Sequence, residues 1–397
     1  MGRASRLMRL DAFTKTVEDA RVRTSSGGIV TIFSVLVIFC LIIGEWNDYR
    51  KVSVISELIV DKTRGEQMEI HLNITFPHIP CELLTLDVMD VSGDLQPSVS
   101  HGIGKHRLDK SGNIIESKFL ELHPEHPKHL DPNYCGECYG ATAPDTSKKA
   151  GCCQTCDDVR EAYAAKGWAF GDGTGVHQCE EEGYKEMLKE QAEEGCRIDG
   201  HLWVNKVVGN FHIAPGKSFS NAQMHVHDLA NYLQGDVHHD FTHTINALSF
   251  GPPLPTDLLH ENHHQQNPLD ATSKKTNDRN YNYLYFLKIV STSYEHLDHG
   301  YTINTHQYSV TSHERSLEGG KDDVHPGTVH ARGGIPGIFF SYDISPMKVV
   351  NREIRTKSFS GFLTSICAII GGTLTVAAAL DRGLYEGARR IGKVHQR

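Results

Sequence analysis

The cysteines of this chain are spaced in a way that suggests three kinds of chemistry. Cys135-Gly-Glu-Cys138 and Cys153-Gln-Thr-Cys156 are two C-x-x-C units with fourteen residues between them, close to the pattern of a four-cysteine zinc site. A C-x-x-C unit is also typical of a thiol redox site, in which a helix N-terminus or a nearby cation lowers the pKa of the thiol. The third alternative is a set of structural disulfides.

Eight of the ten cysteines lie between two long apolar segments near the chain ends, and an even count favours disulfides in an oxidising compartment. Asp157 and Asp158 follow Cys156 directly, and their charges would oppose a thiolate there. We therefore expect bridged cysteines, with zinc binding and redox catalysis by Cys153 and Cys156 as alternatives. The sequence does not determine the pairing. The candidates for bridges are Cys81, Cys135, Cys138, Cys152, Cys153, Cys156, Cys179 and Cys196.

Histidine is abundant, with 25 copies, and it is the side chain whose charge changes near pH 6.5. His225-Val-His227 would place two imidazoles on one face of an extended strand, which is half of a metal site. Because the sequence names no further ligand, we predict no metal and no cofactor. A group of histidines could instead sense a step from neutral to mildly acidic pH. The candidates for this role are His225, His227, His238, His239 and His243.

Motifs of common enzymes are absent from the sequence. There is no nucleophile elbow, zinc-protease motif or phosphate-binding loop, and Gly102-Ile-Gly104 lacks the third glycine of a dinucleotide fingerprint. No concentrated basic face suggests binding of nucleic acid. We therefore predict a protein that is not an enzyme and does not bind nucleic acid.

Two apolar segments, Ile29–Ile43 with its flanking residues and Phe359–Leu380, are the candidates for crossing a bilayer, which requires about 20 residues of helix. More than twenty residues precede the first segment and no cleavage site follows Gly44, so a retained anchor is expected. We expect tails at residues 1–26 and 381–397, spans at 27–46 and 358–380, and a large domain at 47–357.

The charges flanking the spans predict their orientation. Six basic residues against three acidic ones precede the first span, and five against two follow the second, so both tails are expected to be cytoplasmic. The domain between the spans would then be lumenal. The sequon Asn73-Ile74-Thr75 fits an oxidising lumen and predicts a glycan on Asn73.

The elements expected in this domain are mainly strands. Met68–Phe76 alternates apolar and polar residues, which predicts a strand that buries one face and turns Asn73 to solvent. With further β-rich runs, it predicts a lumenal all-β domain, most simply a β-sandwich. Within residues 130–200 the spacing becomes helical, which predicts a small cysteine-rich α-helical insertion. The other strand-like runs are Leu83–Val91, His201–Ile213, Tyr281–Val290, Tyr301–Val310 and Gly337–Ile344, and the helical ones are Asp157–Trp168 and Glu180–Glu194.

Several blocks along the chain together resemble one known family. They are Lys15-Thr-Val-Glu-Asp19, Asp61-Lys-Thr-Arg-Gly65, Phe76-Pro-His-Ile-Pro-Cys81, Cys135-Gly-Glu-Cys-Tyr-Gly140, Cys152 through Asp158-Val-Arg-Glu-Ala-Tyr163 to Gly167-Trp-Ala-Phe170, Val208-Gly-Asn-Phe-His-Ile-Ala-Pro-Gly-Lys-Ser-Phe219, His225-Val-His-Asp-Leu229, Ser345-Pro-Met347 and Cys367-Ala-Ile-Ile-Gly-Gly372. The chain closely resembles the endoplasmic reticulum-Golgi intermediate compartment protein 3 family, called in fungi the 46 kDa endoplasmic reticulum vesicle protein.

The resemblance implies a cargo receptor that cycles between the endoplasmic reticulum and the Golgi in coated vesicles. It implies a smaller sister protein as partner in a hetero-oligomer, lumenal proteins as cargo, and return of escaped resident proteins. Capture could depend on pH through the histidines. The resemblance also implies a short hydrophobic signal for the COPII coat, matched by Leu384 and Tyr385. It implies a basic signal for the COPI coat as well, for which the candidates are Arg389, Arg390 and Lys393.

Two other functions remain as alternatives. A lumenal thiol oxidoreductase would use Cys153 and Cys156, and a scaffold protein of early secretory membranes would hold a partner without selecting cargo. Small residues from Ala368 to Gly372 form a patch in the second span that could let a partner helix approach.

Overall fold

The computed structural model describes residues 24–62, 66–90, 102–119, 134–144, 147, 149–221, 224–234, 237–253, 267–297, 300, 302–321 and 329–395. The chain divides into two compact units. The helical unit comprises Met1–Ser56, Glu295–Tyr301 and Asn351–Arg397, and the β unit comprises Glu57–Tyr294 and Thr302–Val350.

One six-stranded sheet of the β unit has the strand that alternates most regularly near its centre. β2 (Gln67–Phe76) buries every second residue, and its neighbours are β10 and β6. Alternation of this kind produces one apolar and one polar face, because successive side chains point to opposite sides of a strand. In order across the sheet, the strands are β11 (Thr272–Lys274), β10 (His243–Phe250), β2, β6 (Gly195–Asn205), β4 (Gly102–Leu108) and β5 (Ile114–Phe119).

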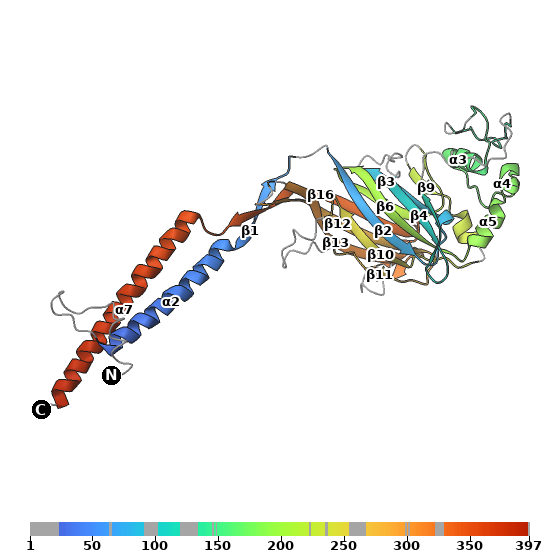
Figure 1. The fold of residues 1–397 in the computed structure, drawn as a ribbon. Helices are drawn as coiled ribbons and strands as arrows, with labels where there is room; N and C mark the ends of the chain where they lie inside the picture. The colour runs from blue at the N-terminus through green and yellow to red at the C-terminus, as the bar shows by residue number, and fades with distance from the viewer. Residues whose placement is uncertain are drawn as a thin grey trace. The chain divides into compact units, whose positions relative to one another are not determined.

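The second sheet supplies the other wall of the core. β3 pairs antiparallel with β7, and β7 pairs antiparallel with β16. The strand order is β13 (Thr302–Ser316), β12 (Tyr281–Glu295), β16 (Gly337–Arg355), β7 (Gly209–Pro215) and β3 (Leu84–Asp90), with β1 (Val52–Val60) pairing with β16. Figure 1 shows the strands of both sheets in the β unit.

Apolar side chains from both sheets form one continuous core, so the predicted β-sandwich is confirmed. Phe340 of β16 lies between Phe211 and Tyr285, with ring centroids 4.6 and 5.0 Å away. The predicted run His201–Ile213 is two strands rather than one, because the chain turns between Asn205 and Gly209. That turn is anchored by Lys206, whose Nζ donates a hydrogen bond to Asp61 over 2.9 Å.

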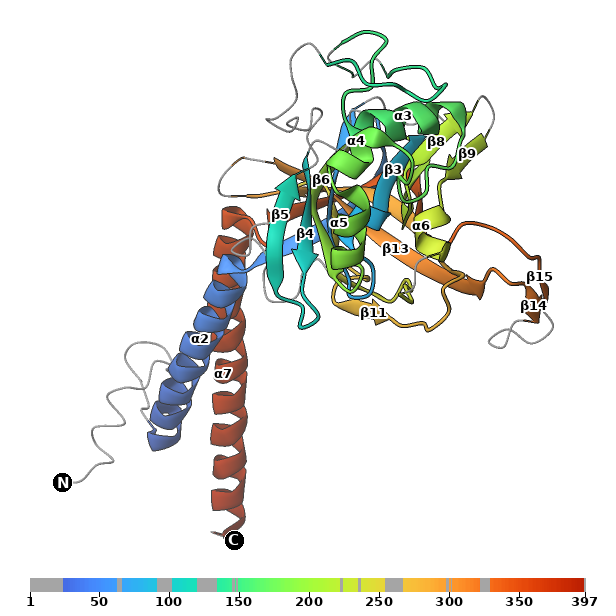
Figure 2. The same ribbon diagram turned by 90° about the vertical axis from the view of Figure 1, so that its right-hand side faces the viewer.

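Short helices and hairpins lie outside the two sheets. The helical insertion contains α3 (Cys156–Lys166), α4 (His177–Glu181) and α5 (Tyr184–Gln191), which Figure 2 shows together near the hairpin of β8 and β9. The remaining elements of the β unit are the 3-10 turn η2 (Cys81–Leu83), β8 (Ser218–Asn221), β9 (Met224–His227), α6 (Ala230–Gln234), β14 (Gly320–Lys321) and β15 (Val329–His330).

The helical unit contains two helices that are long and apolar enough to cross a membrane. They are α2 (Ser25–Arg50) and α7 (Phe359–His395), and both extend beyond the predicted spans. Phe362 of α7 stacks on Tyr49 of α2 with ring centroids 4.8 Å apart. Lys357 donates to Glu45 over 2.6 Å close to the same end of the pair.

Candidate functional site

All eight cysteines predicted to be bridged are paired. The three bridges Cys135–Cys152, Cys138–Cys153 and Cys156–Cys179 lie within the insertion, and Cys81–Cys196 joins η2 to β6. Neither C-x-x-C unit is bridged to itself. The zinc and redox alternatives would need these sulfurs free, whereas each of them is bridged to a cysteine outside its own C-x-x-C unit. Cys40 and Cys367, in the two long helices, are free thiols.

A buried glutamine holds the two C-x-x-C segments together between the bridges. Gln178 donates through Nε2 to the carbonyls of Glu137 and Cys153, over 2.9 and 2.8 Å, and its Oε1 accepts from the Tyr139 hydroxyl over 3.1 Å. Gly136 permits this close approach, because a Cβ there would lie 2.1 Å from the carbonyl oxygen of Cys153. A satisfied amide of this kind fixes the loops where little apolar core is available.

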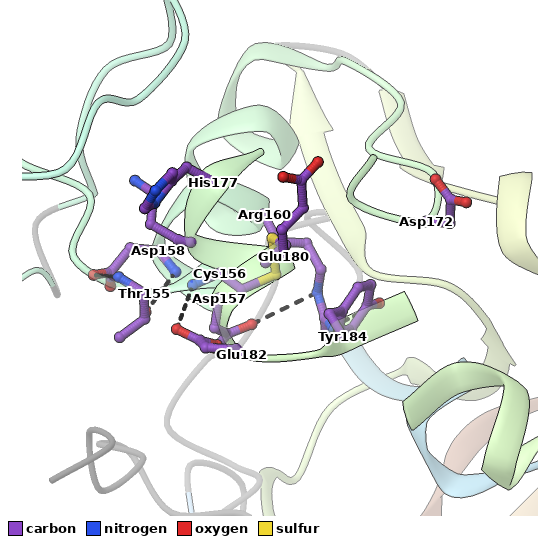
Figure 3. Close-up of a disulfide and its surroundings, with 12 residues drawn as sticks. Thr155, Cys156, Asp157, Asp158, Arg160, Asp172, His177, Glu180, Glu182 and Tyr184 are labelled. Carbon is purple, nitrogen blue, oxygen red and sulfur yellow. Dashed lines mark hydrogen bonds and ion pairs between the residues drawn. A yellow bond between two sulfur atoms is a disulfide. The ribbon is translucent and has the colours of Figure 1, made fainter. Parts of the chain in front are cut away.

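The start of α3 explains the acidic residues after Cys156. Thr155 and Asp158 form a capping box, in which the Thr155 hydroxyl accepts from the Asp158 amide over 3.1 Å and the Asp158 carboxylate accepts from the Thr155 amide over 3.1 Å. The Cys156 amide donates to Glu182 over 3.0 Å (Figure 3). Asp158 therefore satisfies backbone donors at the helix start, a role that the sequence reasoning did not assign to it.

The insertion is attached to the sandwich by charged contacts. Arg160 of α3 donates to Glu82 of η2 over 2.6 Å and to the Tyr184 hydroxyl of α5 over 3.2 Å. Burial opposes the charge of Arg160, but Glu82, Tyr184 and Asp157 together outweigh it, so the pKa of Arg160 lies above its ordinary value. Lys217, beside β8, reaches Asp157 over 3.4 Å. These pairs connect α3 to η2, to α5 and to the residue before β8.

A groove of about 540 Å³ lies where α5 meets the sandwich. Pro80, Leu83, Leu188, Ala192 and Val237 provide an apolar surface, and Asp172, Lys185, Lys189 and His239 are among the polar residues that line it. Lys185 is paired with Asp172 over 2.7 Å, and Lys189 is exposed. Concave, mainly apolar surfaces with a few polar groups are the usual form of a binding site.

Two of the five histidines proposed as pH sensors are unsuited to that role. His243 is 1% exposed and contacts the Phe241 carbonyl and the Tyr285 hydroxyl, and burial lowers its pKa to about 4. Burial likewise lowers the pKa of His239. His243 is therefore expected to stay neutral at mildly acidic pH, and His239 is harder to protonate than an exposed histidine. His238 is exposed and contacts the Asn277 carbonyl over 2.9 Å.

His227 belongs to a buried cluster that the sequence did not reveal. Its Nε2 lies 3.2 Å from Nε2 of His212 and 3.4 Å from the Asp87 carboxylate. The side chain of its predicted companion, His225, lies outside the described residues. His212 occurs in the Gly-Asn-Phe-His block already singled out, but its approach to Asp87 follows from strand pairing, which no local pattern reports.

Three further predicted positions, Asn73, Leu384 and Tyr385, lie on exposed or half-buried surfaces. Asn73 lies on the polar side of β2, where its side-chain oxygen accepts from Asn246 over 2.7 Å. Leu384 is 56% exposed on α7 and Tyr385 follows it in the same helix. The side chains of Arg389, Arg390 and Lys393 lie outside the described residues.

The two long helices enclose an apolar groove of about 430 Å³. Gly372 of the predicted small-residue patch lines it together with Ile29, Phe33, Val376 and other apolar residues. A Cβ on Gly372 would meet no heavy atom within 4 Å, so a larger side chain fits there without disturbing this chain.

Comparisons with known proteins agree along almost the whole chain. The family model described as "Endoplasmic reticulum vesicle transporter" matches residues 138–381, and that described as "Endoplasmic Reticulum-Golgi Intermediate Compartment (ERGIC)" matches residues 7–97. The ER-derived vesicles protein ERV46 of Saccharomyces cerevisiae is 41% identical over 99% of each chain. The probable endoplasmic reticulum-Golgi intermediate compartment protein 3 of Dictyostelium discoideum is 44% identical over 98% of this chain and 97% of its own.

Among solved structures, the crystal structure of Erv41p aligns with 75% of this chain and 99% of its own, at 18% identity and a TM-score of 0.39, a likeness too remote to carry an argument. The two family models and the full-length relatives confirm the predicted resemblance, and the chain belongs to the endoplasmic reticulum vesicle transporter family.

Proposed function

We propose that this protein is a cargo receptor that cycles between the endoplasmic reticulum and the Golgi and returns escaped resident proteins. The observation that carries the proposal is membership of a family of vesicle transport proteins along nearly the full chain. The disulfide-bonded insertion and its adjoining groove support it, since they offer a folded surface for a protein ligand.

The proposed orientation places the β unit in the lumen and both tails in the cytoplasm, with Asn73 glycosylated. The basic tails and the four disulfides support this orientation. Protease treatment of sealed microsomes should remove only the terminal tails, and endoglycosidase should shift the wild type but not Asn73→Gln. A protected N-terminus would contradict the two-span arrangement.

Cargo is proposed to bind in the groove beside α5. Its apolar surface suits an exposed hydrophobic segment, and Lys189 suits an acidic group on that segment. A photo-crosslinking residue at Lys189 of the full-length protein should capture lumenal proteins. Lys288 provides a matched control, because it is another exposed lysine and lines a different groove, on the second sheet. Equal capture at both positions would place the binding surface elsewhere.

Binding is proposed to strengthen in the more acidic compartment through exposed histidines. His238 remains a candidate, and His78 joins it because its Nδ1 lies 2.8 Å from the nearly buried Asp240 carboxylate. Cargo binding should rise from pH 7.4 to 6.0 in the wild type and in His201→Gln, and rise less in the double variant His78→Gln, His238→Gln. An unchanged response in the double variant would assign the pH dependence to other groups.

The sister protein is proposed to contact the groove between α2 and α7. Gly372→Leu should fill this groove without a clash inside the chain and so weaken co-purification of the partner. Gly44→Leu is the control, since a Cβ there also meets no heavy atom within 4 Å and Gly44 does not line the groove. Association that survives Gly372→Leu would assign the contact to the β unit.

Coat binding is proposed for the exposed end of α7. Leu384 and Tyr385 would contact COPII, and Arg389, Arg390 and Lys393 would contact COPI. Leu384→Ala with Tyr385→Ala should reduce packaging into COPII vesicles, whereas changing the three basic residues should slow return from the Golgi. An unaltered distribution in both variants would leave the tail without a sorting role.

The scaffold alternative differs from the receptor in one measurable respect. A scaffold holds its membrane partner but captures no lumenal protein, so Lys189 would crosslink to the partner alone. The oxidoreductase alternative would require Cys153 and Cys156 to leave their bridges to Cys138 and Cys179.

A further inference from the structure

Three chemically related side chains converge on one buried point of the β unit. Asp87 of β3 and His212 of β7 are direct partners in the antiparallel register, so their side chains share one face of the sheet. His227 arrives from β9, whose hairpin partner Ser218 lies opposite it. The exposed fractions of Asp87, His212 and His227 are 9%, 2% and 5%.

The spacing of the three ligand atoms fits a tetrahedral metal ion. Oδ2 of Asp87 lies 3.4 Å from Nε2 of His227 and 3.7 Å from Nε2 of His212, and the two nitrogens are 3.2 Å apart. Zinc bonds of about 2.0–2.2 Å to nitrogen and carboxylate oxygen place neighbouring ligands of a tetrahedron about 3.4 Å apart. Each of the three separations is close to that value.

The groups around the cluster orient the ligand atoms toward one another. Ser218 donates its hydroxyl to Oδ1 of Asp87 over 2.7 Å, which leaves Oδ2 directed at the imidazoles. Nδ1 of His227 lies 3.2 Å from the Gly216 carbonyl, and donation to that carbonyl leaves the lone pair on Nε2. Such supporting hydrogen bonds are typical of metal-binding histidines and carboxylates.

Gly216 is required for this support. Its φ of +78° is in the left-handed region, and a Cβ on it would lie 1.8 Å from the Asp228 carbonyl oxygen. On the other side, the His212 ring stacks on Phe339 with centroids 5.0 Å apart. The ring positions of both histidines are thus fixed by backbone and packing rather than by solvent.

We propose that Asp87, His212 and His227 bind one divalent transition-metal ion, with zinc the best fit to two imidazoles and a carboxylate. The ion would join the β8–β9 hairpin to β3 and β7, at one edge of the second sheet. Because Lys217 beside β8 pairs with Asp157 of α3, the same ion would help to hold the insertion in place.

A metal-free arrangement is the competing explanation of these distances. In that arrangement, Nε2 of one histidine donates its N–H to Nε2 of the other, and the Asp87 carboxylate lies beside both nitrogens. Such contacts between buried polar groups also need no metal. The two arrangements differ in measurable metal content. The chain offers a matched control in Glu69, His71 and His201, whose ligand atoms also lie close together but on a partly exposed surface.

The test uses the full-length protein purified in detergent, incubated with zinc, desalted and measured by mass spectrometry of the metal. We expect one zinc per chain in the wild type and in His71→Gln, and at least a tenfold lower content in His227→Gln and in Asp87→Asn. Cobalt added to chelator-treated wild type should produce the visible absorption of a tetrahedral site, and Ser218→Ala should weaken metal affinity by about 10-fold or more.

A stability measurement covers the case in which the ligand variants fail to fold. In the full-length wild type, a chelator should lower the temperature at which the β unit unfolds. Adding zinc, but not magnesium, should restore that temperature, because a ligand that binds only the folded state stabilises it. Wild type that holds no stoichiometric zinc after incubation, or zinc that is lost in His71→Gln and retained in His227→Gln, would overturn the proposal.

Discussion

The sandwich is built around a large apolar core from two sheets, whereas the insertion has a small core in which half of the buried residues are bridged cysteines. The sandwich brings distant strands together by burying aromatic and branched side chains between its layers. The insertion holds short helices by covalent bonds and by single buried groups such as Gln178. A region with little apolar surface to bury needs cross-links to remain ordered.

The three tryptophans make the comparison measurable. Trp203 lies in β6 of the sandwich, Trp168 follows α3 of the insertion, where it packs against Tyr163, and Trp46 lies in α2. Variants that retain only Trp203 or only Trp168 therefore report separately on the unfolding of the two regions.

The largest effect is expected from Phe340→Ala in the sandwich. Removing this ring from between Phe211 and Tyr285 leaves a cavity and should lower the free energy of unfolding by about 3–5 kcal/mol. Denaturant titration should show this loss at Trp203 and a smaller change at Trp168. Phe286→Ala is the control, because Phe286 is 48% exposed and its removal should cost less than about 0.5 kcal/mol. Equal losses at both tryptophans would mean that the two regions unfold as one.

Removal of the Cys138–Cys153 bridge should destabilise the insertion more than the sandwich, the reverse of the effect of Phe340→Ala. With both cysteines changed to Ala, a loop with a sequence separation of 15 is released, and the insertion should lose about 3 kcal/mol. Trp168 fluorescence and hydrogen exchange should report the loss, with Trp203 little changed. The control Cys40→Ala removes a free thiol and should leave both transitions in place.

Acidification should act on the sandwich through buried histidines. The folded-state pKa of His243 is about 4, below the ordinary value near 6.5, because the side chain is buried. The unfolded chain therefore binds the extra proton between these values, so the stabilisation is complete above about pH 6.5 and is lost as the pH falls toward 4. The loss should approach ~1.4 kcal/mol per pH unit for this group.

Denaturant midpoints read at Trp203 from pH 7.5 to 4.5 measure this effect. His306, whose pKa burial also lowers to about 4, should add a similar slope. In His243→Gln, the dependence of the unfolding free energy on pH should lose the contribution of one titrating group. The variant should also be less stable than the wild type at neutral pH. A slope that His243→Gln leaves unchanged would show that other groups take up the protons.

The smallest effect is expected from Thr155→Ala at the start of α3. Loss of the capping box should cost about 1 kcal/mol and appear at Trp168 alone. Thr155→Ser retains the hydroxyl and should restore most of the stability. A loss that Ser does not repair would assign the effect to the packing of the threonine methyl group.

Local patterns predicted the elements better than their partners. The alternation in β2 and the helical spacing of α3 and α5 could be read directly, because each depends on residues next to one another in the chain. β10 was not predicted, although its residues His243–Phe250 include Ile245, Leu248 and Phe250; the histidine-rich stretch lies just before it. The turn at Lys206 was missed because its anchor, Asp61, is 145 residues away.

In the candidate site, too, the local features were predicted and the contacts between distant residues were not. The even count and the expected lumenal setting predicted bridged cysteines, but the interleaved pairing depends on how the loops meet at Gln178. Three of the five chosen histidines, His227, His239 and His243, are buried, and burial lowers the pKa of the last two, which no sequence pattern around them indicates. The Asp87 cluster depends on pairing of β3 with β7 and on a hairpin contact that spans 131 residues.

The Cys81–Cys196 bridge encloses the other three, because Cys135, Cys138, Cys152, Cys153, Cys156 and Cys179 all lie between its ends in the chain. The whole insertion is thus a covalent loop closed at its base. A protease that cuts once inside the loop opens it but releases no fragment until the disulfide is reduced. A receptor nicked there would remain one covalent molecule, and the cut would become visible only on a reducing gel.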